Sequence, residues 1–123
     1  MSLNLTDEEA SDILSTALEG GSTYWLNEEY ADDAFSVITV KDKSMLGWSY
    51  AGLIVKQKKK DKLTKRFVIG LGDIKLAADA IVTYSVKVHK SIIADIVTER
   101  GACDAESADA VLQVAMLGEL VFG

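Results

Sequence analysis

The apolar residues of this chain repeat at two different periods, and the change between them limits the folds that it can form. Four stretches carry apolar side chains at helical spacing: 7–19, a stretch that starts at Asp73, 88–99 and 105–117. Three stretches between the first and second of these are rich in β-branched and aromatic residues, as strands are: 34–40, 46–55 and 63–69. The pattern predicts one α+β domain over residues 1–123, with an N-terminal helix, a small antiparallel β-meander and about three C-terminal helices.

Polar residues and glycines mark the ends of the first and last helices. Thr6 and Glu9 have the spacing of a capping box, in which each side chain accepts from the backbone N–H of the other residue. The Gly20-Gly21 pair is expected to end the first helix, because glycine tolerates the left-handed conformation found there. Asp104 is a favourable N-cap for the helix at 105–117, and Gly118 is expected to end it.

Composition excludes several classes of protein. The chain is 49% hydrophobic and 26% charged, which is typical of a folded globular domain. We expect no membrane partner, because no apolar run approaches the roughly 18–20 residues that cross a bilayer, and we see no secretory signal. A single cysteine, Cys103, excludes an intramolecular disulfide and a multi-cysteine zinc site, and it favours a reducing, intracellular compartment.

Charge is strongly separated along the sequence, although the net charge is only −6. Residues 56–66 carry seven cations and one anion, a local charge of +6; the cations are Lys56, Lys58, Lys59, Lys60, Lys62, Lys65 and Arg66. At the tip of a hairpin these side chains could hold nucleic-acid phosphate without reading base sequence. Lysines there also keep sheet edges apart and the tip solvated, and we favour this interpretation because the rest of the chain would repel a polyanion.

Three aromatic residues flank the basic segment on the expected strands: Trp48, Tyr50 and Phe67. Beside a cationic hairpin, exposed aromatic rings could stack on single-stranded bases. Aromatic side chains also dominate the energetics of protein interfaces, so any exposed part of these three is the first place to expect a protein partner.

The first 33 residues hold nine carboxylates and no Lys or Arg. Glu28, Glu29, Asp32 and Asp33 would cluster on a helix, and such oxygen-rich groups can hold Mg²⁺ or Ca²⁺. No EF-hand spacing is present and no histidine lies nearby, so we expect a solvated acidic face and no metal. The acids of residues 7–33 could also mimic a phosphate track and occupy a DNA-binding protein.

No motif for catalysis or for a cofactor emerges. Residues 69–75, IGLGDIK, resemble a phosphate loop only faintly, since Lys75 stands where a third glycine belongs. The only histidine, His89, has no nucleophile at a recognisable spacing. Cys103 lies beside Asp104 and Glu106, whose charges raise a thiol pKa. We therefore predict no catalytic residue, no cofactor and no enzyme activity.

Two segments resemble a known group of proteins. ALEGGSTYW (17–25) and DAESADAVLQVAMLGELVFG (104–123) are similar to the start and the end of small, functionally uncharacterised proteins of tailed bacteriophages and prophages. Leu117 stands where that group has an aromatic residue. The resemblance implies a phage origin and the cytoplasm of a bacterial host, with the virion as the other location, and it implies no mechanism.

The two resembling segments are expected to meet. Trp25 and the Val121-Phe122 tail would pack on each other, and Gln113 would either bond a neighbouring loop or mark a contact surface. Our leading hypothesis is a non-enzymatic phage-type accessory protein that binds protein, including a second copy of itself. The alternatives are a nucleic-acid-associated protein that uses 56–66 and an acidic DNA mimic that uses 7–33.

Overall fold

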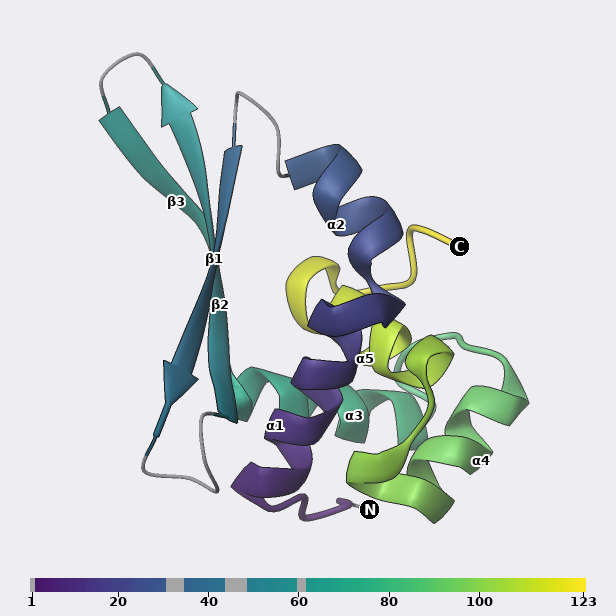
Figure 1. Ribbon diagram of the computed structural model, residues 1–123. Helices are drawn as coiled ribbons and strands as arrows, with labels where there is room; N and C mark the ends of the chain where they lie inside the picture. The colour runs from purple at the N-terminus through teal and green to yellow at the C-terminus, as the bar shows by residue number, and fades with distance from the viewer. Residues whose placement is uncertain (1, 31–34, 44–48, 60–61) are drawn as a thin grey trace.

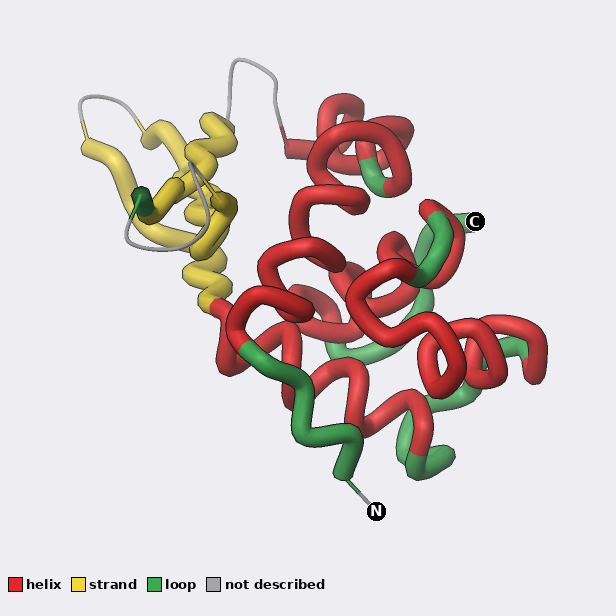
Figure 2. Tube along the Cα trace, turned by 60° about the horizontal axis from the view of Figure 1, so that its bottom comes forward, coloured by secondary structure: helices red, strands yellow, loops and turns green. Residues whose placement is uncertain are grey.

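The computed structural model describes residues 2–30, 35–43, 49–59 and 62–123. Helices pack on one side of a three-stranded sheet, and within these residues no element covers the opposite side of the sheet (Figure 1). Figure 2 shows the same division, with the strands gathered at one side of the helical body. The expected α+β fold is confirmed.

The sheet is the predicted antiparallel meander. Its strands are β1 (Phe35–Asp42), β2 (Ser49–Lys59) and β3 (Lys62–Gly70), in the order β1-β2-β3. Lys59 lies opposite Lys62, so the basic segment forms the end of the β2–β3 hairpin, as predicted. The second strand extends four residues beyond the expected end at Val55, because cross-strand pairing continues through the lysines.

The first helix is shorter than predicted. The capping box is present, with Glu9 N–H donating to Thr6 Oγ1 (3.1 Å) and Thr6 N–H to Glu9 Oε1 (3.0 Å), and α1 spans Asp7–Thr16. The chain then forms a π-helical turn at Ala17–Gly21 and continues as α2 (Thr23–Tyr30). The prediction that Gly20-Gly21 ends the helix at residue 19 is therefore wrong.

Close packing explains the role of Gly21. A Cβ atom on Gly21 would lie 2.5 Å from the carbonyl oxygen of Ala105, whereas one on Gly20 would meet nothing within 4 Å. Gly21 is thus a site of close backbone approach between the π-helical turn and the start of the last helix.

The C-terminal half forms the three expected helices: α3 (Leu71–Val82), α4 (Lys90–Glu99) and α5 (Ala105–Leu117). Asp104 caps α5 by accepting from Ser107 N–H (3.0 Å), and Gly118 follows it with a φ of 81°. The predicted start of α4 at residue 88 is two residues early, because His89 is its N-cap and accepts from Ser91 N–H (3.1 Å).

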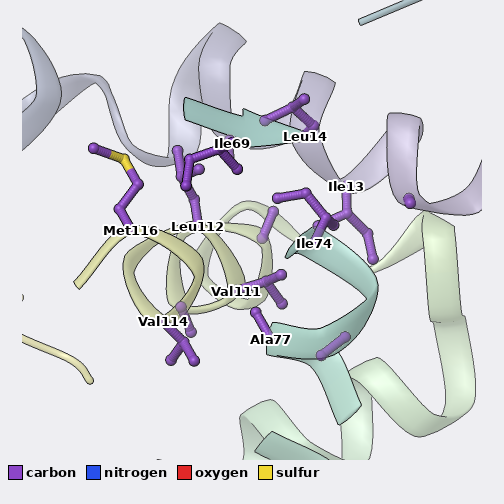
Figure 3. Packing of buried hydrophobic residues seen from close by; sticks show 14 of the residues in the cluster. Ile13, Leu14, Ile69, Ile74, Ala77, Val111, Leu112, Val114 and Met116 are labelled. Atoms are coloured by element: carbon purple, nitrogen blue, oxygen red, sulfur yellow. The ribbon is translucent and has the colours of Figure 1, made fainter. Parts of the chain in front are cut away.

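The hydrophobic core lies where α1, α3, α5 and the inner face of the sheet meet (Figure 3). Ile13, Ile74 and Val111, one from each of these helices, are fully buried. Helix α5 is the central element, since nine of its thirteen residues are buried. Burial on nearly all sides places three polar residues of α5 inside the protein, and two of them, Asp109 and Gln113, build the polar network described below.

Candidate functional site

The inner and outer faces of the sheet follow from its register. Leu53 and Val55 are fully buried under the helices, so the residues that alternate with them project from the outer face. Ile38 pairs with Ile54, which pairs with Val68, and this row crosses all three strands. The exposed fractions of Ile38 and Val68 are 40% and 56%, and Ile54 is half-buried.

Val40 extends this row along β1, with 38% of its surface exposed. We call Ile38, Val40, Ile54 and Val68 the outer apolar face. Lys56 follows Ile54 on the same face of β2, toward the basic hairpin. The outer side of the sheet is therefore apolar at its centre and cationic at one end.

The aromatic residues predicted as an interface lie elsewhere. Phe67 pairs with the buried Val55 and packs against the core. Tyr50 is also half-buried against the core, because the register shift after Val40 turns it to the inner face, where the Lys41 ammonium lies 4.8 Å from its ring centroid. Trp48 lies outside the described residues. An interface through these three residues stays a prediction.

The predicted phosphate-binding cations gather on the hairpin, although they come from two strands. Lys56 lies opposite Lys65 and Lys59 opposite Lys62. Lys60 lies outside the described residues, as do the side chains of residues 57–66. Of the seven cations only Lys56 has a described side chain, and that side chain is half-buried. Like charges directly opposite each other destabilise a ladder, so this end of the sheet favours an anionic neighbour.

A buried polar network joins the two segments on which the phage resemblance depends. The carboxylate of Asp109, which is 7% exposed, accepts four hydrogen bonds. Its Oδ1 accepts from Ser22 Oγ (2.8 Å) and Trp25 Nε1 (2.7 Å), and its Oδ2 from Tyr24 Oη (2.7 Å) and Gln113 Nε2 (3.1 Å). Each oxygen therefore has two donors, which is the full acceptor capacity of a carboxylate.

Gln113 extends this network to the C-terminal tail. Its Oε1 accepts from the N–H groups of Val121 (2.9 Å) and Phe122 (2.8 Å), and its Nε2 donates to the carbonyl oxygen of Phe122 (3.0 Å). The Phe122 ring stacks on Trp25 with centroids 5.0 Å apart and planes inclined by 6°. The expected Trp25–Phe122 contact is confirmed, and of the two roles expected for Gln113 the bond to a neighbouring segment is present.

Asp109 is the residue that the sequence interpretation missed. Its position near the start of the last helix suggests a solvated acid that favours the helix dipole. Two features of the sequence indicate that Asp109 is buried. Most residues of α5 are apolar, as in a helix surrounded by protein, and the i, i+4 spacing puts Asp109 and Gln113 on one face of that helix. Burial and the neighbouring Asp109 carboxylate raise the pKa of Tyr24 to about 12, so its hydroxyl remains a donor.

A cleft of about 610 Å³ lies beside the network, between α2, α5 and the C-terminal tail. Tyr24, Ile92 and Phe122 are among its walls, and His89 and Glu106 contribute polar groups. His89 uses Nδ1 to cap α4, and the amide and carboxylate groups of the network are bonded to one another. The cleft therefore shows no arrangement of nucleophile and base.

The remaining reactive and acidic groups have structural surroundings. Cys103 is buried, and burial raises the pKa of its thiol to about 12, with Asp95 and Asp104 adding to the rise. The sequence predicted that Asp104 and Glu106 raise the thiol pKa; in the structure the two carboxylates that do so are Asp95 and Asp104. In the described part of the chain no three metal-ligating residues come together, and of the predicted acidic cluster Glu28 is exposed while Asp32 and Asp33 lie outside that part.

No protein-family model matches the chain, and comparisons with curated proteins and with solved structures also find no match. None of the helices in the described ranges has both the length and the apolar character needed to cross a membrane.

Proposed function

We propose that this chain is a non-enzymatic accessory protein of phage type that acts by binding another protein through the outer apolar face. The observation that carries the proposal is the row Ile38, Ile54 and Val68 across the uncovered side of the sheet. Strands that are apolar on both faces are typical of sheets covered on both sides. Here the described helices cover one side only.

The chemistry of the face indicates the kind of partner. Covering the exposed part of an Ile or Val side chain contributes about 1 kcal/mol, so the four residues of the face provide a moderate hydrophobic contribution. Lys56 at one end, and the cationic hairpin beyond it, favour an acidic group at the corresponding edge of the partner. The fitting surface is thus apolar at its centre and acidic at one side.

Nucleic-acid binding through the hairpin is the second candidate. It is supported by the direct pairing of Lys59 with Lys62 and of Lys56 with Lys65. The acidic mimic has less support, because two of its carboxylates are already paired: Asp7 with Lys75 (2.6 Å) and Glu9 with Arg100 (2.6 Å).

The test compares two lysine substitutions at exposed apolar positions. Val68→Lys changes the outer apolar face, and Leu76→Lys, on α3 and 69% exposed, is the matched control. Proteins retained by the immobilised wild-type chain are identified, purified and titrated against each variant. We expect affinity at least about tenfold weaker for Val68→Lys, which equals 1.4 kcal/mol, and unchanged for Leu76→Lys.

Equal affinity of Val68→Lys and wild type for every purified partner would refute the proposal. The second candidate is tested by fluorescence anisotropy with labelled single- and double-stranded DNA at low and at near-physiological salt. Binding that weakens steeply with salt, and that disappears when lysines 58–60 are changed to glutamate, would place nucleic acid first.

A further inference from the structure

The two edges of the sheet differ in charge. The edge strand β3 carries Lys62, Lys65 and Arg66, which discourage pairing with another strand. The other edge strand, β1, has no charged residue from Phe35 to Val40. Residues 38–41 of β1 are exposed, and within the described ranges the strand pairing of β1 is with β2 alone. The backbone N–H and C=O groups along its outer edge can therefore accept a further strand.

We propose that the edge of β1 pairs antiparallel with β1 of a second copy of this chain, which joins two three-stranded sheets into one. This inference rests on the proposed protein-binding function and names the partner. Pairing of a strand with itself is isologous and closes at two copies. Pairing of β1 with the β3 edge of another copy would be heterologous and would continue into a filament, and the β3 cations oppose it.

Charge disfavours a parallel arrangement of the two β1 strands. Phe35 lies opposite Gln57, so the cationic hairpin stands beside the N-terminal end of β1. A parallel arrangement would bring the two hairpins side by side, where like charges repel. The strand itself is close to neutral, because Lys41 and Asp42 are its only charged residues.

Antiparallel pairing also separates the two cationic hairpins. Phe35 lies opposite Gln57, near the hairpin, and Asp42 lies opposite Ser49, at the far end of the sheet. The two hairpins of a pair would therefore lie at opposite ends, about 25 Å apart along eight strand residues. A two-fold axis perpendicular to the sheet keeps both helical layers on one side. The two outer apolar faces then form one continuous surface, with Ile38 and Val40 of both copies near its centre.

Sedimentation velocity over a wide range of concentration, followed by cysteine crosslinking, tests the inference. The native Cys103 is buried with a raised thiol pKa, so single cysteines can be introduced one at a time at positions 36–40 without a reactive background. Val68→Cys is the matched control, since it is exposed on the same face but on the opposite edge strand. We expect a species of twice the 13.3 kDa chain mass and a disulfide-linked dimer at the one position within 36–40 that lies opposite itself across the two-fold axis, with none at Val68.

Each other outcome overturns the inference in a distinguishable way. A monomer at every concentration excludes the second copy but leaves the Val68→Lys titrations with foreign partners as an independent test of the proposed function. A dimer that crosslinks at Val68 and not at 36–40 would mean packing between the outer faces, which refutes edge pairing and supports the proposed binding face.

Discussion

Replacement of Asp109 by alanine should be among the most destabilising single changes in this protein. The substitution removes the acceptor for two donors on nearly inaccessible residues, the Ser22 hydroxyl and the Trp25 indole N–H. A buried donor that loses its acceptor costs about 1–3 kcal/mol, so the two together, with a small cavity, should lower the free energy of unfolding by about 3–5 kcal/mol. Typical domains have only about 5–15 kcal/mol of stability, so a large part would be lost.

The isosteric change Asp109→Asn separates loss of the acceptor from loss of volume. An asparagine oxygen at the Oδ1 position still accepts from Ser22 and Trp25, but its NH₂ group then faces the Tyr24 hydroxyl and the Gln113 amide donor. The hydroxyl can rotate to accept, whereas the amide N–H cannot. We therefore expect a loss of about 1–2 kcal/mol, between wild type and alanine.

Urea denaturation followed by circular dichroism measures the free energy of unfolding for each variant. Asp12→Ala, at an exposed carboxylate on α1, is the control and should lie within about 0.5 kcal/mol of wild type. A loss below about 1 kcal/mol for Asp109→Ala, or equal losses for alanine and asparagine, would refute the view that the four accepted hydrogen bonds stabilise the fold.

Three further changes test other parts of the structure. Phe122→Ala removes the stack on Trp25 and should cost about 1–3 kcal/mol in the same assay, whereas unchanged stability would contradict a role for the tail. The hydrogen bond from Arg100 lowers the pKa of Glu9 to about 2. The ionised Glu9 therefore stabilises the fold fully above pH 4.5, the ordinary pKa of a glutamate, and this stabilisation is lost as the pH falls toward 2. Glu9→Gln should lower the free energy of unfolding by no more than about 1 kcal/mol at neutral pH, because the ion pair is partly exposed, and it should flatten the pH dependence of unfolding between pH 2 and 4.5. Gly21→Ala should lower the melting temperature because of the close contact with α5, whereas Gly20→Ala should keep or raise it; the reverse order would contradict the packing at the π-helical turn.

Local chemistry made much of the fold predictable. The capping box at Thr6, the cap at Asp104 and the left-handed Gly118 each depend on a few neighbouring residues, and the structure contains all three. The strands and the placement of the lysines at the hairpin also follow from local composition and turn length. Stacking of Trp25 on Phe122 was predictable because two large apolar side chains near opposite ends of the chain needed burial.

Long-range contacts account for what the sequence did not predict. Gly21 has the local signature of a helix end, but the chain continues there through a π-helical turn, and the glycine is needed because the Ala105 backbone approaches it closely. Asp109 has the local signature of a solvated acid, and only the burial of α5 on most sides turns it into an acceptor for four donors. The sequence did not predict the outer apolar face, because aromatic residues are the usual mark of an interface and the exposed row consists of Ile and Val.

The bonds at Asp109 also bear on how long the molecule stays folded. Trp25 and Asp109 are 84 positions apart, and the entire sheet lies in the chain between them. Contacts of such long sequence separation are expected to form late, after the local helices and hairpins, since loop closure must precede them. Interactions absent from the folding transition state affect the unfolding rate alone. Variants of Asp109 should therefore refold nearly as fast as wild type and unfold much faster, which stopped-flow kinetics would measure, and slowed refolding would show that the two segments associate early. On this basis the network determines the lifetime of the native state.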